Sequence, residues 1–208
     1  MDADCSVELG PEAPALELPW EDPEGRWHYV ELRSELQDEA AGEAGSSGSK
    51  LVGIPEAQQF PALGRFLAEA NSPQSAWQTA KCGVWAEQTD AHGNFYNAGF
   101  VHGCYVDLVL ARPWAALRES LEEHQRLAEE MARMLGANES LEAIGEIVVR
   151  RCYFHREASP EESDAGYSLT FFLAGYGASA DAALECWEQT LAFAGECLLN
   201  LQAGENSA

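Results

Sequence analysis

The sequence predicts an α+β fold in which an antiparallel sheet built from two hairpins packs with about three helices, in the order α-ββ-α-ββ-α. Three stretches repeat apolar residues at helical spacing, and four have the alternation or the β-branched and aromatic content of strands. The start of the chain is instead acidic and rich in Pro, Gly and Ser. We therefore expect a flexible, partly disordered N-terminal segment (1–49), a single compact domain (50–203) and a frayed C-terminus (204–208).

The N-terminal segment carries much of the charge of the chain. Residues 1–49 hold 13 acidic residues and two basic ones, Arg26 and Arg33. Residues 42–49 are mainly Gly and Ser, a composition typical of a flexible linker, which predicts a boundary near residue 50. Three aromatic side chains of the segment are costly to leave in water: Trp20, Trp27 and Tyr29. We expect the segment to pack partly on its own domain, with docking on a partner as the alternative.

The first half of the compact domain predicts one helix and one hairpin. Pro55 suits a first helical turn, and the apolar spacing that follows predicts a helix to about Ala70, although Pro61 would also fit a start near Phe60. Residues 81–88 and 95–110 have strand character and are separated by a turn-forming run. Gly99 and Gly103 suggest a bulge in the second strand, or two shorter strands in its place.

The second half repeats this order. A long helix is expected from Arg112 to about Leu135, followed by strands at 146–156 and 167–174 joined by a polar loop over 158–166. Ser179 is a suitable cap for a last helix, with Asp181 in its first turn. The glycines at 175 and 177 fit a tight turn from strand to helix, because the full dinucleotide-binding pattern and the P-loop lysine are absent.

This element order resembles that of the small acidic chaperones of type III secretion. The resemblance covers about 150 residues and concerns the order of helices and strands, with no shared motif. It implies a protein that binds another protein. The long middle helix and the front segment have no counterpart in that family.

The formal charge of −23 limits the partners that the protein can have. Nucleic acids and anionic membranes are both disfavoured by electrostatics. The acidity fits solubility, complementarity to a basic partner, or adaptation to high salt. We expect a cytoplasmic protein with reduced thiols, because the sequence shows neither a long apolar run nor the basic start of a signal peptide.

The last helix contains the candidate partner-binding residues. Beside its core stripe it carries a second, mildly apolar stripe roughly opposite, made of Cys186, Thr190, Phe193 and Cys197. Such a helix is either sandwiched within the fold or pairs with another subunit or a partner protein, because a contiguous apolar patch is costly to expose. Homo-oligomerisation through this helix is therefore one expectation.

The two hairpins contain the residues of an alternative pocket, which would belong to a small enzyme or ligand-binding domain. The set is Trp85, His102, Cys104, Tyr153 and His155. His102 and Cys104 with Cys152 and His155 have the residue types of a zinc site, but strand alternation places 152 and 155 on opposite faces. The same residue types could supply a cysteine nucleophile, yet none of the known cysteine signatures is present.

The sequence therefore predicts a non-catalytic acidic protein that binds a protein partner with basic character, as an inhibitor, immunity protein or chaperone does. We expect no cofactor, no metal and no catalytic residue. The alternatives are the enzyme or ligand-binding domain with the hairpin pocket, and an assembly subunit or homo-oligomeric structural protein.

Overall fold

A six-stranded mixed sheet is the centre of the fold, in a computed structural model that describes residues 1–21, 24–25, 29–33, 51–90, 94, 96–156 and 159–201. The order is β1-β5-β6-β4-β3, with β2 also on β5. The strands are β1 (Asp2–Glu8), β2 (Leu16–Leu18), β3 (Trp77–Gln88), β4 (Phe100–Leu110), β5 (Ala143–Arg156) and β6 (Ser159–Gly177). β1 and β2 run parallel to β5, whereas the other pairs are antiparallel. The predicted two-hairpin antiparallel sheet is therefore wrong.

The start of the chain belongs to the sheet, which corrects the expectation of a flexible segment in front of the fold. Ala3 and Cys5 on β1 pack against the core, while Asp2 and Asp4 are exposed. The amino group of Met1 donates a hydrogen bond to the carbonyl oxygen of Asn138. The predicted linker over 42–49 and the frayed end over 204–208 lie outside the described residues, so the boundary near residue 50 stays a prediction.

Four α-helices occur in the described residues, not three. They are α2 (Pro55–Gln59), α3 (Pro61–Ala70), α4 (Leu121–Gly136) and α5 (Ala180–Asn200), and two short 3₁₀ helices cover Leu51–Gly53 and Arg112–Leu117. The helix predicted over 55–70 divides at Phe60, whose backbone is extended before Pro61. The predicted long helix begins as a 3₁₀ helix, and α4 starts only after the Ser120 cap.

Both hairpins were predicted correctly in position, but their strands differ in length. β5 ends at Arg156 as predicted, but β6 begins at Ser159, so most of the predicted polar loop is strand. Arg156 binds the Asp164 carboxylate at 2.5 Å across this extension. The irregularity expected near Gly99 or Gly103 lies instead on β3, between Thr79 and Lys81. With two strands in front and an extra helix, the element order of the type III secretion chaperones does not hold.

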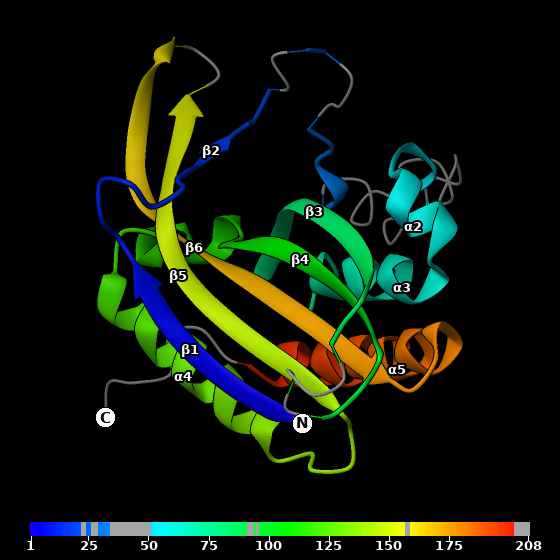
Figure 1. Ribbon diagram of the computed structural model, residues 1–208. Coiled ribbons are helices and arrows are strands. Elements are labelled where there is room, and N and C mark those ends of the chain that lie inside the picture. Colours follow the sequence, from blue (N-terminus) through cyan, green and yellow to red (C-terminus); the bar gives the residue numbers. More distant parts are fainter. Residues whose placement is uncertain are drawn as a thin grey trace.

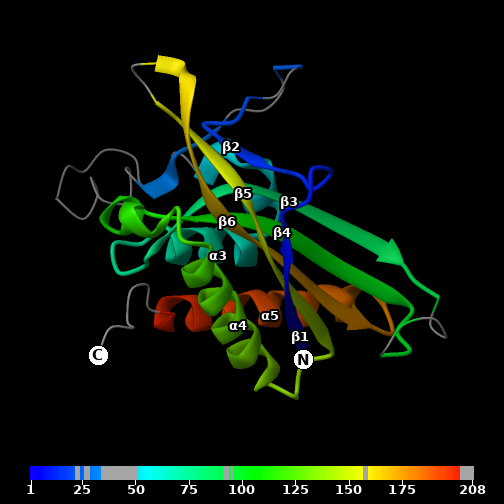
Figure 2. The same ribbon diagram turned by 90° about the vertical axis from the view of Figure 1, so that its left-hand side faces the viewer.

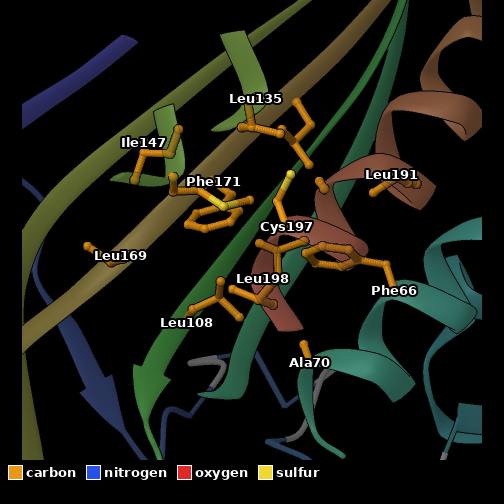
Figure 3. Close-up of a cluster of buried hydrophobic side chains, with 14 of the residues drawn as sticks. Phe66, Ala70, Leu108, Leu135, Ile147, Leu169, Phe171, Leu191, Cys197 and Leu198 are labelled. Carbon is orange, nitrogen blue, oxygen red and sulfur yellow. The ribbon is translucent and has the colours of Figure 1, made fainter. Parts of the chain in front are cut away.

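Helices α3, α4 and α5 cover one face of the sheet, which we call the helix face (Figure 1). The main core lies between these helices and the sheet and contains the fully buried Phe66 and Phe171 (Figure 3). Trp187 is also fully buried in this core. The cap and first turn predicted for α5 are confirmed, because the Ser179 side chain accepts a hydrogen bond from the amide of Ala182. None of the helices in the described residues combines the length and apolar character needed to cross a bilayer.

A second, smaller core lies on the opposite face, where the N-terminal strap (described residues of 16–33) crosses the upper end of the sheet (Figure 2). Leu18 of the strap packs with Val109 and Cys152. Trp20 and Tyr29 pack at the rim of this cluster, which confirms that the segment packs on its own domain; Trp27 lies outside the described residues. The strap reaches β3 and makes one side of a cavity there.

Candidate binding groove along strand β3

A cavity of about 810 Å³ lies between the strap, helix α2 and strand β3, and we call it the β3 groove. The strap supplies Trp20, Glu21, Val30 and Leu32. Ile54, Pro55 and Glu56 lie at the start of α2. The other side consists of Thr79 to Val84 with Tyr105; Gly53 and Leu67 complete the lining. A volume of this size is in the range of about 300 to 1,000 Å³ that is usual for ligand sites.

Contacts between the strap and β3 hold one wall of the groove in place. The indole Nε1 of Trp20 donates to the carbonyl oxygen of Ala80 at 2.7 Å. The ammonium of Lys81 lies 5.7 Å from the centroid of the same indole ring, in a cation–π contact. At the base of the strap, Arg33 donates to the carbonyl oxygen of Trp77 at 2.5 Å. These contacts fix the wall that the strap contributes.

The floor of the groove depends on a glycine. Gly83 on β3 lies opposite Tyr105 on β4, and a Cβ at Gly83 would be 2.6 Å from the Tyr105 ring. The tyrosine ring therefore lies across the glycine, which brings an aromatic surface to the edge of the sheet. Burial, with a smaller contribution from the nearby carboxylates of Asp107 and Glu56, raises the pKa of Tyr105 to about 12. Its hydroxyl stays protonated at neutral pH.

The lining of the groove combines aliphatic side chains with two carboxylates and one ammonium group. Val30, Leu32, Ile54 and Leu67 give it aliphatic walls. Glu56 is half-buried and Glu21 is exposed, and Lys81 is the one basic residue of the lining. Within the described part of the chain, no hydrogen bond or ion pair occupies the Glu56 carboxylate. A ligand that combines apolar surface with positive charge suits this lining.

A buried acid, Asp107, lies behind the groove. Its carboxylate accepts a hydrogen bond of 2.6 Å from the Thr170 hydroxyl, and it faces Lys81 across the β3–β4 pair. Burial raises the pKa of Asp107, while Thr170, Arg150 and Lys81 oppose that shift. Arg150 lies 3.4 Å from the Thr170 hydroxyl and also binds Glu8 at 2.9 Å. A hydrogen-bonded polar row therefore runs across four strands of the sheet, through Glu8, Arg150, Thr170 and Asp107.

The raised pKa of Asp107 gives a prediction for stability. Because the folded protein disfavours the charged form, the free energy of unfolding falls as the pH rises from the ordinary Asp range to the folded pKa and stays low above it. Asp107→Asn should therefore be more stable than the wild type at neutral pH and equal to it at about pH 3. Urea unfolding at both pH values measures this. The exposed control Asp2→Asn should show no such difference; a less stable Asp107→Asn at neutral pH would contradict the prediction.

The five residues of the sequence-predicted pocket are not brought together. His102 and Cys104 are buried on the helix face, where the His102 ring lies 4.5 Å from that of Trp187. Trp85 covers Gly103 on the opposite face, since a Cβ there would be 2.5 Å from its ring. Tyr153 and His155 lie at the far end of β5 beside β2, and His155 Nε2 is 3.3 Å from a Glu17 carboxylate oxygen.

Neither zinc nor thiol chemistry finds support in this placement. Within the described residues, no three side chains of His, Cys, Asp or Glu gather closely enough to hold a metal ion. Burial raises the pKa of all six thiols, to about 12 for Cys82, Cys104 and Cys152. A reactive cysteine requires the opposite shift, so these thiols behave as small apolar groups.

The second stripe of α5 is largely occupied by the protein itself. Thr190 is fully buried, and Cys197 is 6% exposed and lies within the core cluster of Figure 3. Cys186 and Phe193 are half-buried and pack against that core. Helix α5 contacts α3 on one side and β4 and β6 on another, which leaves little of the stripe for a second molecule.

The groove residues were not predicted as a site from the sequence. Trp20 was noted for its cost in water, and residues 81–88 for their strand character, but nothing in the sequence joins the strap to β3. Comparison of the chain with protein-family models, with curated proteins and with solved structures gave no match. Function is therefore inferred from the groove and the charge.

Proposed function

We propose that this protein is a non-catalytic binding protein whose β3 groove receives a basic segment of a partner protein. The observation that carries the proposal is the composition of the groove, whose lining combines aliphatic side chains with the Glu21 and Glu56 carboxylates. Apolar side chains of the partner would fill the interior, and Lys or Arg would reach the openings. Such a protein would act as an inhibitor, an immunity protein or a chaperone.

The charge of the whole chain supports the same partner. A formal charge of −23 attracts cationic surfaces over distances of about a Debye length, roughly 8 Å at physiological salt, and raises the rate of association. It repels nucleic acids and anionic membranes. The proposal places the protein in the cytoplasm, where its six free thiols would remain reduced.

A labelled peptide tests this proposal. The probe is a fluorescent ten-residue peptide that alternates Lys or Arg with Val or Ile, and fluorescence anisotropy measures its Kd. Glu56→Gln should weaken binding by about two- to fivefold, since a charge at the rim of an interface contributes about 0.5 to 1 kcal/mol. For the wild type, raising the salt concentration to about 500 mM should also weaken binding of the peptide, because salt screens these charges.

Matched controls separate the groove from the general field of the protein. Glu139→Gln makes the same change of charge at an exposed site between α4 and β5, and it should bind the probe as the wild type does. A peptide with Glu in place of every Lys or Arg should not bind. Equal weakening by both Gln variants, or no binding of the basic probe at low salt, would refute the proposal.

A further inference from the structure

Strand β3 forms one edge of the described sheet, so one side of its backbone faces away from β4. The amide of Thr89 donates to the carbonyl oxygen of Gly99 at 2.9 Å, which shows that Thr89 faces the β4 side. Backbone direction alternates along an antiparallel strand, and the register is regular from Lys81 onward. The N–H and C=O groups of Cys82, Val84 and Ala86 therefore point outward.

The chain itself covers the first half of this edge. The outward carbonyl oxygen of Trp77 accepts a hydrogen bond from Arg33 at 2.5 Å. The Thr79 amide donates to the Asn71 side chain at 3.1 Å, and the Ala80 carbonyl accepts from Trp20 at 2.7 Å. Each of these side chains takes the place that a neighbouring strand would occupy.

This cover of the strand edge ends after Ala80, inside the groove. Cys82 and Val84 line the β3 groove, and among the described residues no group hydrogen-bonds to their outward backbone atoms. Folded proteins usually cover or disrupt such an edge, because its unpaired groups are a template for another strand. Here the open pair lies in a cavity with apolar and acidic walls.

We propose that the partner segment binds as an added β-strand along β3, with its backbone hydrogen-bonded to Cys82 and Val84. This inference rests on the proposed function and specifies its mode of binding. Successive side chains of an added strand point to opposite faces. One set would meet Ile54 and Val84 on the helix face, and the other would meet Tyr105 and Trp20. The charge of Glu21 and Glu56 selects a basic segment over an acidic one.

Proline substitution tests the backbone contact. Val84→Pro removes one outward N–H and should raise the Kd of the basic peptide by about tenfold or more. Gln88→Pro makes the same change on the same edge beyond the groove, and its Kd should stay within about twofold of the wild-type value. Circular dichroism confirms that each variant is folded.

A second measurement uses the unmodified protein and decides the matter if Val84→Pro does not fold. Two series of peptides carry N-methyl groups at odd or at even backbone positions. The series that blocks the N–H groups facing β3 should lose binding, and the other series should retain it. Hydrogen exchange at the amides of Cys82 and Val84 should slow when the parent peptide binds. If the parent peptide binds but N-methylation and Val84→Pro have no effect, strand addition is wrong while the proposed function stands. If the parent peptide does not bind, both fail.

Discussion

Gly175→Ala should lower the free energy of unfolding by about 2 to 3 kcal/mol, although it adds a single methyl group. Gly175 lies on β6 directly beneath helix α5. A Cβ at this position would be 2.2 Å from the amide nitrogen of Trp187 and 2.7 Å from the carbonyl carbon of Cys186. These are backbone atoms of a long helix, so they cannot move aside as the end of a flexible side chain would.

Urea unfolding measures this difference, and Gly136→Ala is the matched control. Gly136 ends α4, and a Cβ there meets no atom within 4 Å. Its substitution should be neutral or slightly stabilising, because alanine has the lower entropy cost in a helix. A stability loss below about 1 kcal/mol for Gly175→Ala would show that α5 can shift away from the sheet.

The glycines of β6 show how a correct observation received the wrong explanation. Gly175 and Gly177 stand out in the sequence before the last helix, and a tight turn was expected there. Both lie within β6 instead, and a Cβ at Gly177 would be 2.5 Å from the Ala183 amide. The approach of a helix to a sheet is a tertiary contact, so local pattern alone does not reveal it.

The strand β1 had a readable pattern that its acidity concealed. Asp2 and Asp4 are exposed and alternate with the half-buried Ala3 and Cys5, which is the period of two expected for a half-buried strand. The acidic composition of residues 1–49 favoured a flexible segment over this short alternation. The strand is stabilised by parallel pairing with β5, more than 130 residues later in the chain, and no local propensity predicts that partner.

The β3 groove could not be assembled from the sequence for the same reason. The strand predicted over 81–88 is present as part of β3, and its alternation places Cys82 and Val84 on one face. Which strand forms an edge depends on the order of the sheet, however, and the strap that borders the groove is separated from β3 by more than 40 residues. Sequence periodicity gave the faces of the strands, and the tertiary fold gave the site.

Trp187→Ala should be the most destabilising single change, with a loss of about 3 to 5 kcal/mol in the free energy of unfolding. The side chain is fully buried on α5 between the sheet and the α2–α3 junction. Its ring lies 5.4 Å from that of Phe60 in an edge-on arrangement and 4.5 Å from that of His102. Removal of the indole therefore leaves a cavity at the point where three elements meet.

The comparison of Trp187→Ala with Trp187→Phe and Leu199→Ala isolates this cause. Phenylalanine keeps part of the ring packing and should recover a large part of the loss. Leu199 lies on the same helix but is 39% exposed, so its truncation should change stability by no more than about 0.5 kcal/mol. Thermal and urea unfolding measure the stability of all three variants.

The Trp187→Ala substitution should also affect peptide binding, because Phe60 joins α3 to the helix that carries Glu56. The folded fraction of Trp187→Ala should bind the basic peptide less tightly, whereas Leu199→Ala should bind it as the wild type does. Equal free energies of unfolding for Trp187→Ala and Leu199→Ala would mean that packing at the α2–α3 junction does not depend on the indole.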